Sequence, residues 1–540
     1  MNFISILGLL LLLGLAWLLS YHKKEINIRP IFWGIGLQLI FALIILREDH
    51  WSFIGMSILG LLIITFLHQT DDSKLGGGIR SVIIISAFSI ISGFLIYQFS
   101  SIVLYIMGLS LIYMSGNSYF KWHQKSQRYA GSLFLISGII FLISNNLYGK
   151  LIFQEFSNKI AYFLSLSDYG AQFLFANLAN NEHFFPGADA GWPGFGFQFA
   201  FKVLPTIVFF GGFMSVLYYL GIMQKAIIAM SRFMRWTIGT SGAETLSCSA
   251  NIFVGQTEAP LLIKPFLDGM TKSELLTIMV GGFATIAGGV LAGYIAMGVP
   301  AGHLVAASVM SAPAALVIGK IIFPEKEHSQ TAGNVELPEI NVGSNAIEAA
   351  SNGITDGLKL AVNVGAMLIG FIALIAVLDV ILNWMDSIID GRLLGGLYTL
   401  YDSSGLSPAK GEYVGYFPGS LQTFFGTILS PLAYMMGVPW EDATKVGNLL
   451  GIKLSLNEFV AYGTLGNYIN SGILSDRAMI ISTYALCGFA NFSSIGIQIG
   501  GISAIAPSRK SDLAKVGLKA MCGGALASWL TATIAGILII

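Results

Sequence analysis

Residues 239–268, GTSGAETLSCSANIFVGQTEAPLLIKPFLD, decide how this chain folds. The stretch is apolar enough to enter a lipid bilayer, but its middle carries four polar residues and a proline: Asn251, Gln256, Thr257, Glu258 and Pro260. A plain membrane-spanning helix does not tolerate such a cluster, because irregular backbone at membrane depth persists only where protein or a wet cavity surrounds it. The stretch therefore predicts a re-entrant helix–turn–helix hairpin with its tip near Val254-Gly255.

The composition of the whole chain favours the same environment. Of the 540 residues, 55% are hydrophobic and only 11% are charged, and the mean hydropathy is +0.73. This leaves too little polar surface for several soluble domains, so we expect one all-α integral membrane domain. The formal net charge is zero and there is no basic block, so no nucleic-acid partner is expected. Cys248, Cys487 and Cys522 lack metal-ligand spacing, and we assign them no chemistry.

Apolar runs long enough to span a bilayer recur along the chain. The first runs from Phe3 to Ser20 and precedes His22-Lys23-Lys24; because basic residues mark the cytoplasmic flank, its N-terminus is expected outside. Interfacial helices are expected within 149–200 and 225–235, and a polar cytoplasmic linker at 324–341 is expected to lead into a short helix. The remaining spans, which bring the total to about twelve, are expected near 31–46, 52–68, 81–98, 101–115, 131–148, 203–221, 276–298, 304–323, 359–383, 478–502 and 518–539.

An internal repeat relates the two halves of the chain. Gly282-Phe283-Ala284 returns as Gly488-Phe489-Ala490, each followed by a polar residue. In both halves an interfacial-looking segment precedes a polar-interrupted segment with a carboxylate, Glu258 in the first and Glu458 in the second. We place the apolar run 419–436 in the outer interface, because the second hairpin then enters from outside and the halves become inverted copies, as in many transporters.

Each hairpin is followed by a span that small and polar residues interrupt, at 284–289 and at 490–494. We expect these four discontinuous elements to converge near mid-membrane, where the ends of broken helices offer unpaired N–H and C=O groups to a cation and a polar solute. A carboxylate at that depth costs ~2.5–3.5 kcal/mol on insertion scales, so Glu258 and Glu458 need partners. A solute rich in hydroxyls and ring nitrogens provides them. Lys453 is expected to snorkel from its helix end toward the membrane surface or to pair with a hairpin carboxylate, rather than to contact the substrate.

Two other classes of function are weighed against a transporter. An intramembrane enzyme acting on lipid-linked phosphates needs aspartate-rich or His/Asp clusters on loops, and the sequence has none. A receptor or structural bundle does not require inverted, broken elements with a carboxylate in each.

Three stretches resemble the concentrative nucleoside transporter family. Residues 255–261 (GQTEAPL) are similar to the family's first-hairpin motif, 451–453 with 457–462 (GIK and NEFVAY) to its signature, and 487–494 (CGFANFSS) to its second broken helix. The likeness continues through 202–206, 239–241 and 363–368, and covers roughly 1–47 and 150–540. The segment from about 50 to 148 departs from shorter bacterial members by adding four spans.

The resemblance implies a symporter for uridine- or adenosine-like nucleosides in the plasma (inner) membrane, neither an enzyme nor dependent on a cofactor. It implies a homotrimer in which a transport domain moves like an elevator against a trimerising scaffold. On matching positions, the ribose hydroxyls contact Glu458, Asn491 and Ser494, and the base faces Gln256, Thr257, Glu258, Val290 and Phe489. The coupling sodium ion is bound by the side chains of Asn251 and Thr285 and the main-chain oxygens of Val254 and Ile286.

Some members of the family couple to protons instead, and Glu258 or Glu458 then carries the proton. The retained Asn251 and the Thr285 hydroxyl favour sodium. The implied division of the chain is 1–48 as N-terminal scaffold helices, 49–148 as inserted helices, 149–224 as interfacial and scaffold helices, 225–323 as the first transport repeat, 324–418 as linker and scaffold helix, and 419–540 as the second transport repeat.

Overall fold

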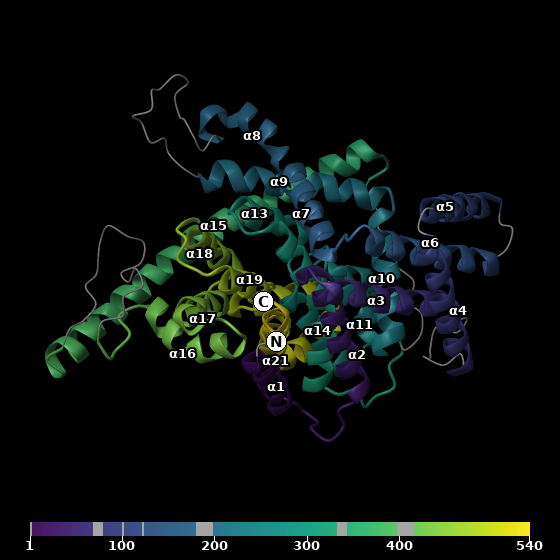
Figure 1. Ribbon diagram of the computed structural model, residues 1–540. Helices are drawn as coiled ribbons and strands as arrows, with labels where there is room; N and C mark the ends of the chain where they lie inside the picture. The colour runs from purple at the N-terminus through teal and green to yellow at the C-terminus, as the bar shows by residue number, and fades with distance from the viewer. Residues whose placement is uncertain are drawn as a thin grey trace.

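The computed structural model describes residues 3–68, 79–99, 102–120, 124–179, 198–331, 343–396 and 415–539. Within these ranges the regular structure is entirely helical (Figure 1). Residues 180–197 of the stretch expected to hold interfacial helices (149–200), and residues 332–341 of the predicted linker, lie outside the described residues.

The N-terminal third consists of eight helices. α1 and α2 pack against the C-terminal helix α21, α3 and α7 pack against α2, and α4, α5 and α6 form a lobe at the right edge of Figure 1. The lobe has a small apolar core of its own, built around Ile96, Val103, Ile136 and Ile140. The bounds are α1 (Phe3–Leu18), α2 (Ile28–Leu46), α3 (His50–His68), α4 (Ile79–Gln98), α5 (Val103–Phe120), α6 (Gln124–Ser144), α7 (Gly149–Ser165) and α8 (Ser167–Phe175), followed by the 3-10 turn η2 (Ala176–Ala179).

Two long helices, α9 (Phe199–Tyr219) and α15 (Ala346–Asp386), cross in close contact. Their backbones approach because glycines meet at the crossing: a Cβ added to Gly211 would lie 2.7 Å from the Gly353 carbonyl oxygen. The sequence predicted a short helix and a separate span near 359–383, but α15 is one continuous helix of 41 residues. Polar residues ahead of the span mark the edge of its apolar part and do not end the helix. α15 continues as the π-helical turn η4 (Ser387–Leu393).

Two sets of helices follow the same order. The first set is α10 (Ile222–Ile238), α11 (Gly242–Ala250), η3 (Ala259–Gly269), α12 (Lys272–Ala284), α13 (Gly288–Ala296) and α14 (Ala301–Ile322). The second set is α16 (Leu421–Met435), α17 (Trp440–Ser455), α18 (Glu458–Asn470), α19 (Asp476–Ala485), α20 (Phe492–Ile505), η5 (Pro507–Arg509) and α21 (Lys510–Leu538). In each set an amphipathic helix precedes a hairpin, then a broken helix, then a long apolar helix.

The hairpins and breaks follow the sequence prediction with local differences. The second arm of the first hairpin, η3, is a 3-10 helix, because Pro260 and Pro265 lack the N–H groups that an α-helix uses. The first break spans 285–287, inside the predicted 284–289. The second spans 486–491, so most of the predicted interruption at 490–494 is already helical in α20.

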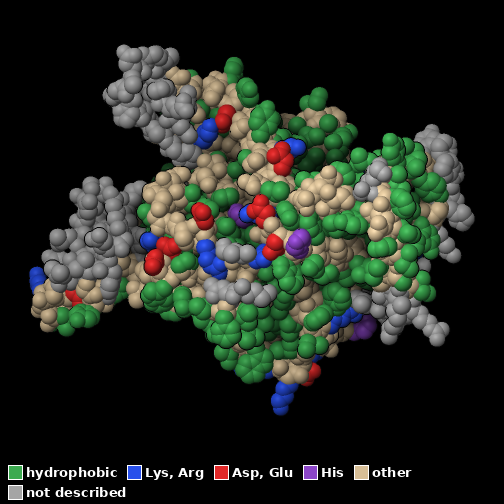
Figure 2. All heavy atoms as spheres, viewed as in Figure 1, with side chains coloured by type: hydrophobic (Ala, Val, Ile, Leu, Met, Phe, Trp, Pro, Cys, Tyr) green, Lys and Arg blue, Asp and Glu red, His purple; other side chains and the backbone are tan. Residues whose placement is uncertain are grey.

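Eight described helices are long and apolar enough to cross a membrane, compared with about twelve predicted spans. The eight correspond to α2, α3, α6, α9, α12–α13, α14, part of α15 and α21. The other four predicted spans fall on α1, α4 and α5, whose apolar described parts are shorter, and on the broken pair α19–α20. The difference lies in length and continuity, since every predicted span coincides with helical structure. Hydrophobic side chains cover much of the visible surface, including the α4–α6 lobe (Figure 2).

α21 connects the bases of the two hairpins. Immediately before its first residue, Arg509 Nη1 donates to the carbonyls of Asp268 (2.8 Å) and Met270 (2.6 Å), where the first hairpin ends. At its other end, Arg477 donates to Gly437 (Nε, 2.7 Å), where the second hairpin begins, and to Ile539 (Nη1, 2.6 Å). The two hairpin bases therefore lie at opposite ends of α21.

Candidate functional site

The tip of the first hairpin lies against the first helix break. The tip is the turn 251–258, and its Phe253 carbonyl accepts a hydrogen bond from the Gly288 N–H, the first residue of α13, at 3.1 Å. On the break, the Thr285 hydroxyl donates to the Gly281 carbonyl at 2.8 Å. The Asn251 amide nitrogen lies 3.4 Å from where a Cβ on Gly281 would be. Asn251 and Thr285, the predicted sodium ligands with side-chain oxygens, therefore flank the same turn of α12.

Asn251 is the polar group of this junction that lacks a partner. Its side chain is 1% exposed, yet neither its Oδ1 nor its Nδ2 has a hydrogen-bond partner among the described residues. An unpaired buried polar group costs ~1–3 kcal/mol, so such a group indicates a missing ligand. The donor set fits a sodium ion, because amide, hydroxyl and main-chain oxygens at an unwound helix are the groups that bind this ion. The two predicted main-chain ligands lie in the same two segments: Val254 in the hairpin tip and Ile286 in the first break.

The second hairpin meets the second break through Glu458 and Asn491. Asn491 Oδ1 caps α20 by accepting from the Ser494 N–H at 2.9 Å. Its Nδ2 donates to Glu458 Oε2 at 3.1 Å. Glu458 is 3% exposed and stands in the first turn of α18, where the helix dipole favours a negative charge. The cap thus fixes the Asn491 amide so that it presents its donor to the carboxylate.

Gln256, at the tip of the first hairpin, joins the two halves by bonding to α20 of the second half. From the first tip, Gln256 Nε2 donates to Ser494 Oγ at 3.4 Å, and Gln256 Oε1 accepts from Gln498 Nε2 at 3.0 Å. A chain of polar groups therefore runs from Glu458 through Asn491 and Ser494 to Gln256. It contains four of the eight residues predicted to bind substrate.

The other four predicted substrate residues have different surroundings. Glu258 is exposed and folds back onto its own turn, where it accepts from the Gly255 N–H. Thr257 packs against Gly501 of α20, Val290 is buried on α13, and Phe489 is half-buried in the second break. The two hairpin carboxylates are thus held differently, because only Glu458 is bound by side chains from other helices in the described structure.

The two helix breaks are in direct backbone contact at Gly488. This residue has a φ of +100°, and a Cβ on it would lie 2.4 Å from the Phe283 carbonyl oxygen and 2.5 Å from the Ala284 carbonyl carbon. Glycine is required here both for the left-handed conformation and for the close approach. The repeated Gly-Phe-Ala tripeptides therefore meet each other in space.

Two residues of the polar chain, Gln498 and Tyr294, were not predicted from the sequence. Gln498 lies one helical turn after Ser494, and Tyr294 lies one turn after Val290; the Tyr294 hydroxyl donates to Glu458 Oε1 at 3.3 Å. The Tyr294 ring stacks on Tyr462 with ring centroids 4.3 Å apart. Residues four apart share one face of a helix, and this spacing could have indicated both.

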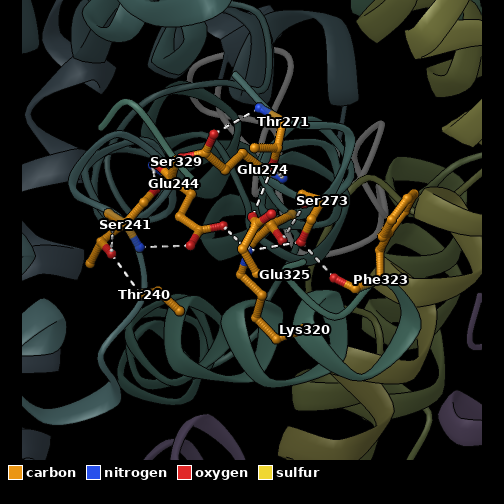
Figure 3. Close-up of polar contacts among 12 residues, drawn as sticks. Thr240, Ser241, Glu244, Thr271, Ser273, Glu274, Lys320, Phe323, Glu325 and Ser329 are labelled. Carbon is orange, nitrogen blue, oxygen red and sulfur yellow. Dashed lines mark hydrogen bonds and ion pairs between the residues drawn. The ribbon is translucent and has the colours of Figure 1, made fainter. Parts of the chain in front are cut away.

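A second polar cluster lies at the N-terminal ends of α11 and α12, away from the tip of the first hairpin. Figure 3 shows its residues. Lys320 Nζ contacts Glu244 Oε2 at 2.8 Å and Glu325 Oε2 at 3.3 Å, and donates to Ser273 Oγ at 2.9 Å. Glu274 accepts from the hydroxyls of Ser329 and Thr331 and, in a capping box, from the Thr271 N–H. The cluster fastens the segment after α14 to the base of the first hairpin.

We expect Lys320→Met to lower the thermal stability of the purified protein strongly. Methionine preserves the volume but leaves the Glu244 carboxylate buried without its cation, a change that typically costs ~3–5 kcal/mol. The matched control is Lys359→Met, whose ion pair with Asp356 is exposed and should leave the unfolding midpoint almost unchanged. Equal midpoints for the two variants would show that the Lys320 cluster does not stabilise the fold.

Three family models match the chain. Their descriptions are "Na+ dependent nucleoside transporter N-terminus" over 7–73, "Nucleoside recognition" over 200–301 and "Na+ dependent nucleoside transporter C-terminus" over 303–536.

Sequence relatives come from bacteria and mammals. An uncharacterized transporter of Haemophilus influenzae is 45% identical over 387 residues, which cover 71% of this chain and 83% of the relative. Sodium/nucleoside cotransporter 1 of Sus scrofa is 41% identical over 405 residues, covering 72% of this chain and 56% of the relative, so only just over half of that longer protein is matched.

Solved structures agree with the sequence relatives. CNTnw in an inward-facing substrate-bound state has a TM-score of 0.70 and 32% identity, and the match covers 99% of this chain and 97% of that one. A doubly substituted variant of CNTnw in an outward-facing state gives a TM-score of 0.71 with the same identity and coverage.

The fold and the site define an all-helical, multi-pass membrane transporter, which is not an enzyme. The long apolar helices and the polar groups enclosed at two helix breaks agree with this class. The chain belongs to the concentrative nucleoside transporter family, with that family's Na+-dependent nucleoside transporter domains.

Proposed function

We propose that the protein imports uridine- or adenosine-like nucleosides together with sodium, through a binding site formed by the hairpin tips and the helix breaks. The observation that carries the proposal is the polar chain from Glu458 to Gln256, which the two hairpins and the second broken helix bring together in an apolar helical protein. In this proposal Glu458, Asn491 and Ser494 bind the ribose hydroxyls. The base lies against the remaining predicted residues, Gln256, Thr257, Glu258, Val290 and Phe489.

Sodium is the proposed coupling ion, and the unpartnered, buried Asn251 side chain supports it. The proposed ligands are the side chains of Asn251 and Thr285 and the main-chain oxygens of Val254 and Ile286. One positive charge that crosses a potential of 100 mV contributes ~2.3 kcal/mol, which is equivalent to about fifty-fold accumulation of the solute. A single ion per nucleoside is therefore sufficient for scavenging.

The proposed architecture is an inverted repeat in the plasma (inner) membrane. It is supported by the positions of the two hairpin bases at opposite ends of α21. In the middle of that helix, Gly524 meets Phe283 at the end of α12 and Ser528 meets Lys453 of the second hairpin. In this arrangement 225–323 and 419–540 form an elevator-type transport domain, and the scaffold assembles as a homotrimer. α15 supports the homotrimer because it exposes apolar side chains such as Ile369, which need cover from lipid or from another copy.

Uptake of radiolabelled uridine and adenosine in cells that express the protein tests the proposal. We expect accumulation above the concentration in the medium when sodium is present, and loss of accumulation when choline replaces sodium. Accumulation that does not depend on sodium but increases with an imposed proton gradient would establish the proton-coupled alternative. No uptake of any nucleoside by correctly inserted protein would refute the proposal.

We expect Asn251→Ala to raise the half-saturating sodium concentration for uptake by about tenfold, because loss of one oxygen ligand weakens a site with few ligands. The measurement is a sodium titration of uridine uptake at constant ionic strength. Asn467→Ala, an exposed asparagine on α18, is the control. An unchanged sodium curve in the Asn251 variant would count against this ion site.

A further inference from the structure

Lys453 is a fully buried lysine near the tip of the second hairpin. Its side chain is 0% exposed, so the prediction that it reaches a helix end at the membrane surface is wrong. Its ammonium does not pair with a hairpin carboxylate in the described structure. Instead Nζ donates to the carbonyls of Ala485 and Cys487 and to the Ser528 hydroxyl, each at 2.9 Å. All three N–H groups of the ammonium are therefore used.

The three acceptors form a site for a cation. Ala485 is the last residue of α19 and Cys487 follows in the break, so both carbonyls belong to the C-terminal end of a half-helix, which attracts positive charge. The Ser528 hydroxyl gives its own hydrogen to the Gly524 carbonyl at 3.0 Å and so faces Lys453 as an acceptor. Two carbonyl oxygens and one hydroxyl oxygen thus surround a single positive charge.

The first repeat also joins its last helix to its hairpin through a serine, but without a lysine. There the last helix, α14, presents Ser308 to the hairpin tip, where its hydroxyl donates to the Ile252 carbonyl at 3.0 Å. Next to Ile252 stands Asn251, the buried side chain without a partner. The buried lysine of this repeat, Lys320, bonds Ser273 at the opposite end of α12 from the break. The described residues where the first hairpin tip meets the first break therefore provide oxygen atoms for a cation but contain no positively charged side chain.

We propose that Lys453 is a tethered cation that does in the second repeat what a sodium ion from solution does in the first, which is to satisfy oxygen atoms where a hairpin meets a helix break. The inference rests on the sodium site proposed above. Where the first hairpin meets the first break, the cation exchanges with the solvent. Where the second hairpin meets the second break, the ammonium of Lys453 permanently satisfies the oxygen atoms. The two junctions together bind one sodium ion per protomer, and Lys453 acts as a positioning residue that holds the break beside Glu458 and Asn491.

The test is to remove the tethered charge and to count sodium ions. Lys453→Ser leaves the three oxygen acceptors, adds a fourth oxygen and opens space for a small cation. We expect radioactive sodium binding to purified protein to rise from one ion per protomer in the wild type to two in this variant. The unfolding midpoint of the variant should also depend more steeply on sodium, in a titration against choline at constant ionic strength.

Two further variants separate this role from simple packing. Lys453→Met keeps the volume but supplies no oxygen and no charge, so it should gain no sodium ion and should lose uptake by about tenfold or more. Lys445→Met removes a half-exposed lysine of the same helix, which pairs with Asp442 at 3.1 Å, and should retain the wild-type sodium count and uptake.

The outcomes distinguish this inference from the proposed function. One sodium ion and a wild-type titration curve for Lys453→Ser, or wild-type uptake by Lys453→Met, would overturn the tethered cation. If neither variant can be purified, the number of sodium ions bound per wild-type protomer decides. One ion supports the inference and two ions overturn it. A wild-type protein that binds no sodium would refute the sodium proposal, whereas a sodium ion gained by Lys453→Ser would still support the tethered cation.

Discussion

Glu458→Gln is expected to reduce nucleoside uptake by about ten- to a hundredfold while the amount of protein in the membrane stays normal. The carboxylate accepts hydrogen bonds from Tyr294 (3.3 Å) and Asn491 (3.1 Å), and it is the proposed acceptor for the ribose hydroxyls. Glutamine has the same shape but no charge, and its NH₂ group would face either the Tyr294 hydroxyl or another NH₂ group, that of Asn491. Hydrogen bonds to a charged group contribute ~1.5–3 kcal/mol, and every ~1.4 kcal/mol is a factor of ten.

The measurement for this variant is uridine uptake normalised to surface protein, together with uridine binding to purified protein. Glu441→Gln provides the control, because it makes the same chemical change at an exposed position in the first turn of α17. Uptake by Glu458→Gln at the wild-type level would exclude the proposed role in ribose binding.

Gly488→Ala is expected to abolish transport and to lower the unfolding midpoint. Alanine is strained at a φ of +100°, at a cost of order 1–3 kcal/mol, and its Cβ would overlap the backbone of Phe283 and Ala284 in the other broken helix. Backbone atoms cannot rotate away as a side chain can, so the two breaks must separate. This separation would also displace Asn491 from Glu458.

Gly500→Ala is the matched control for this substitution. It makes the same change in α20, where a Cβ meets nothing within 4 Å, and alanine is the better helix former. We expect unchanged or slightly higher stability and normal uptake. Normal transport by Gly488→Ala, measured in the same membranes, would show that the contact between the breaks is dispensable.

The discontinuous elements could be predicted from the sequence because polar residues inside apolar runs leave few alternatives. Asn251 to Pro260 cannot lie in a regular spanning helix, and the structure places a turn there between α11 and η3. The second break was placed too late, because it is the side chain of Asn491 that begins α20 as its N-cap. The continuity of α15 was missed for a related reason: polarity reports where a helix leaves lipid, and helix ends depend on caps such as Asn345.

The binding residues were predicted less completely than the fold. The resemblance supplied Glu458, Asn491, Ser494 and Gln256, which the structure connects, and the predicted roles in binding remain predictions. Tyr294 and Gln498 were missed because their contacts depend on how helices from different halves approach, and this is not written in any local pattern. Lys453 was assigned the wrong partners, since hydropathy does not show that the end of α19 leaves two carbonyls free for it.

α21 acts as a strut with an arginine clamp at each end. It has 29 residues and is therefore ~43 Å long at 1.5 Å per residue. Because Arg509 fastens the foot of one hairpin to it and Arg477 the foot of the other, neither foot can swing outward independently. In the proposed elevator motion, the strut and both hairpins would therefore move past α9 and α15 together, as one rigid body.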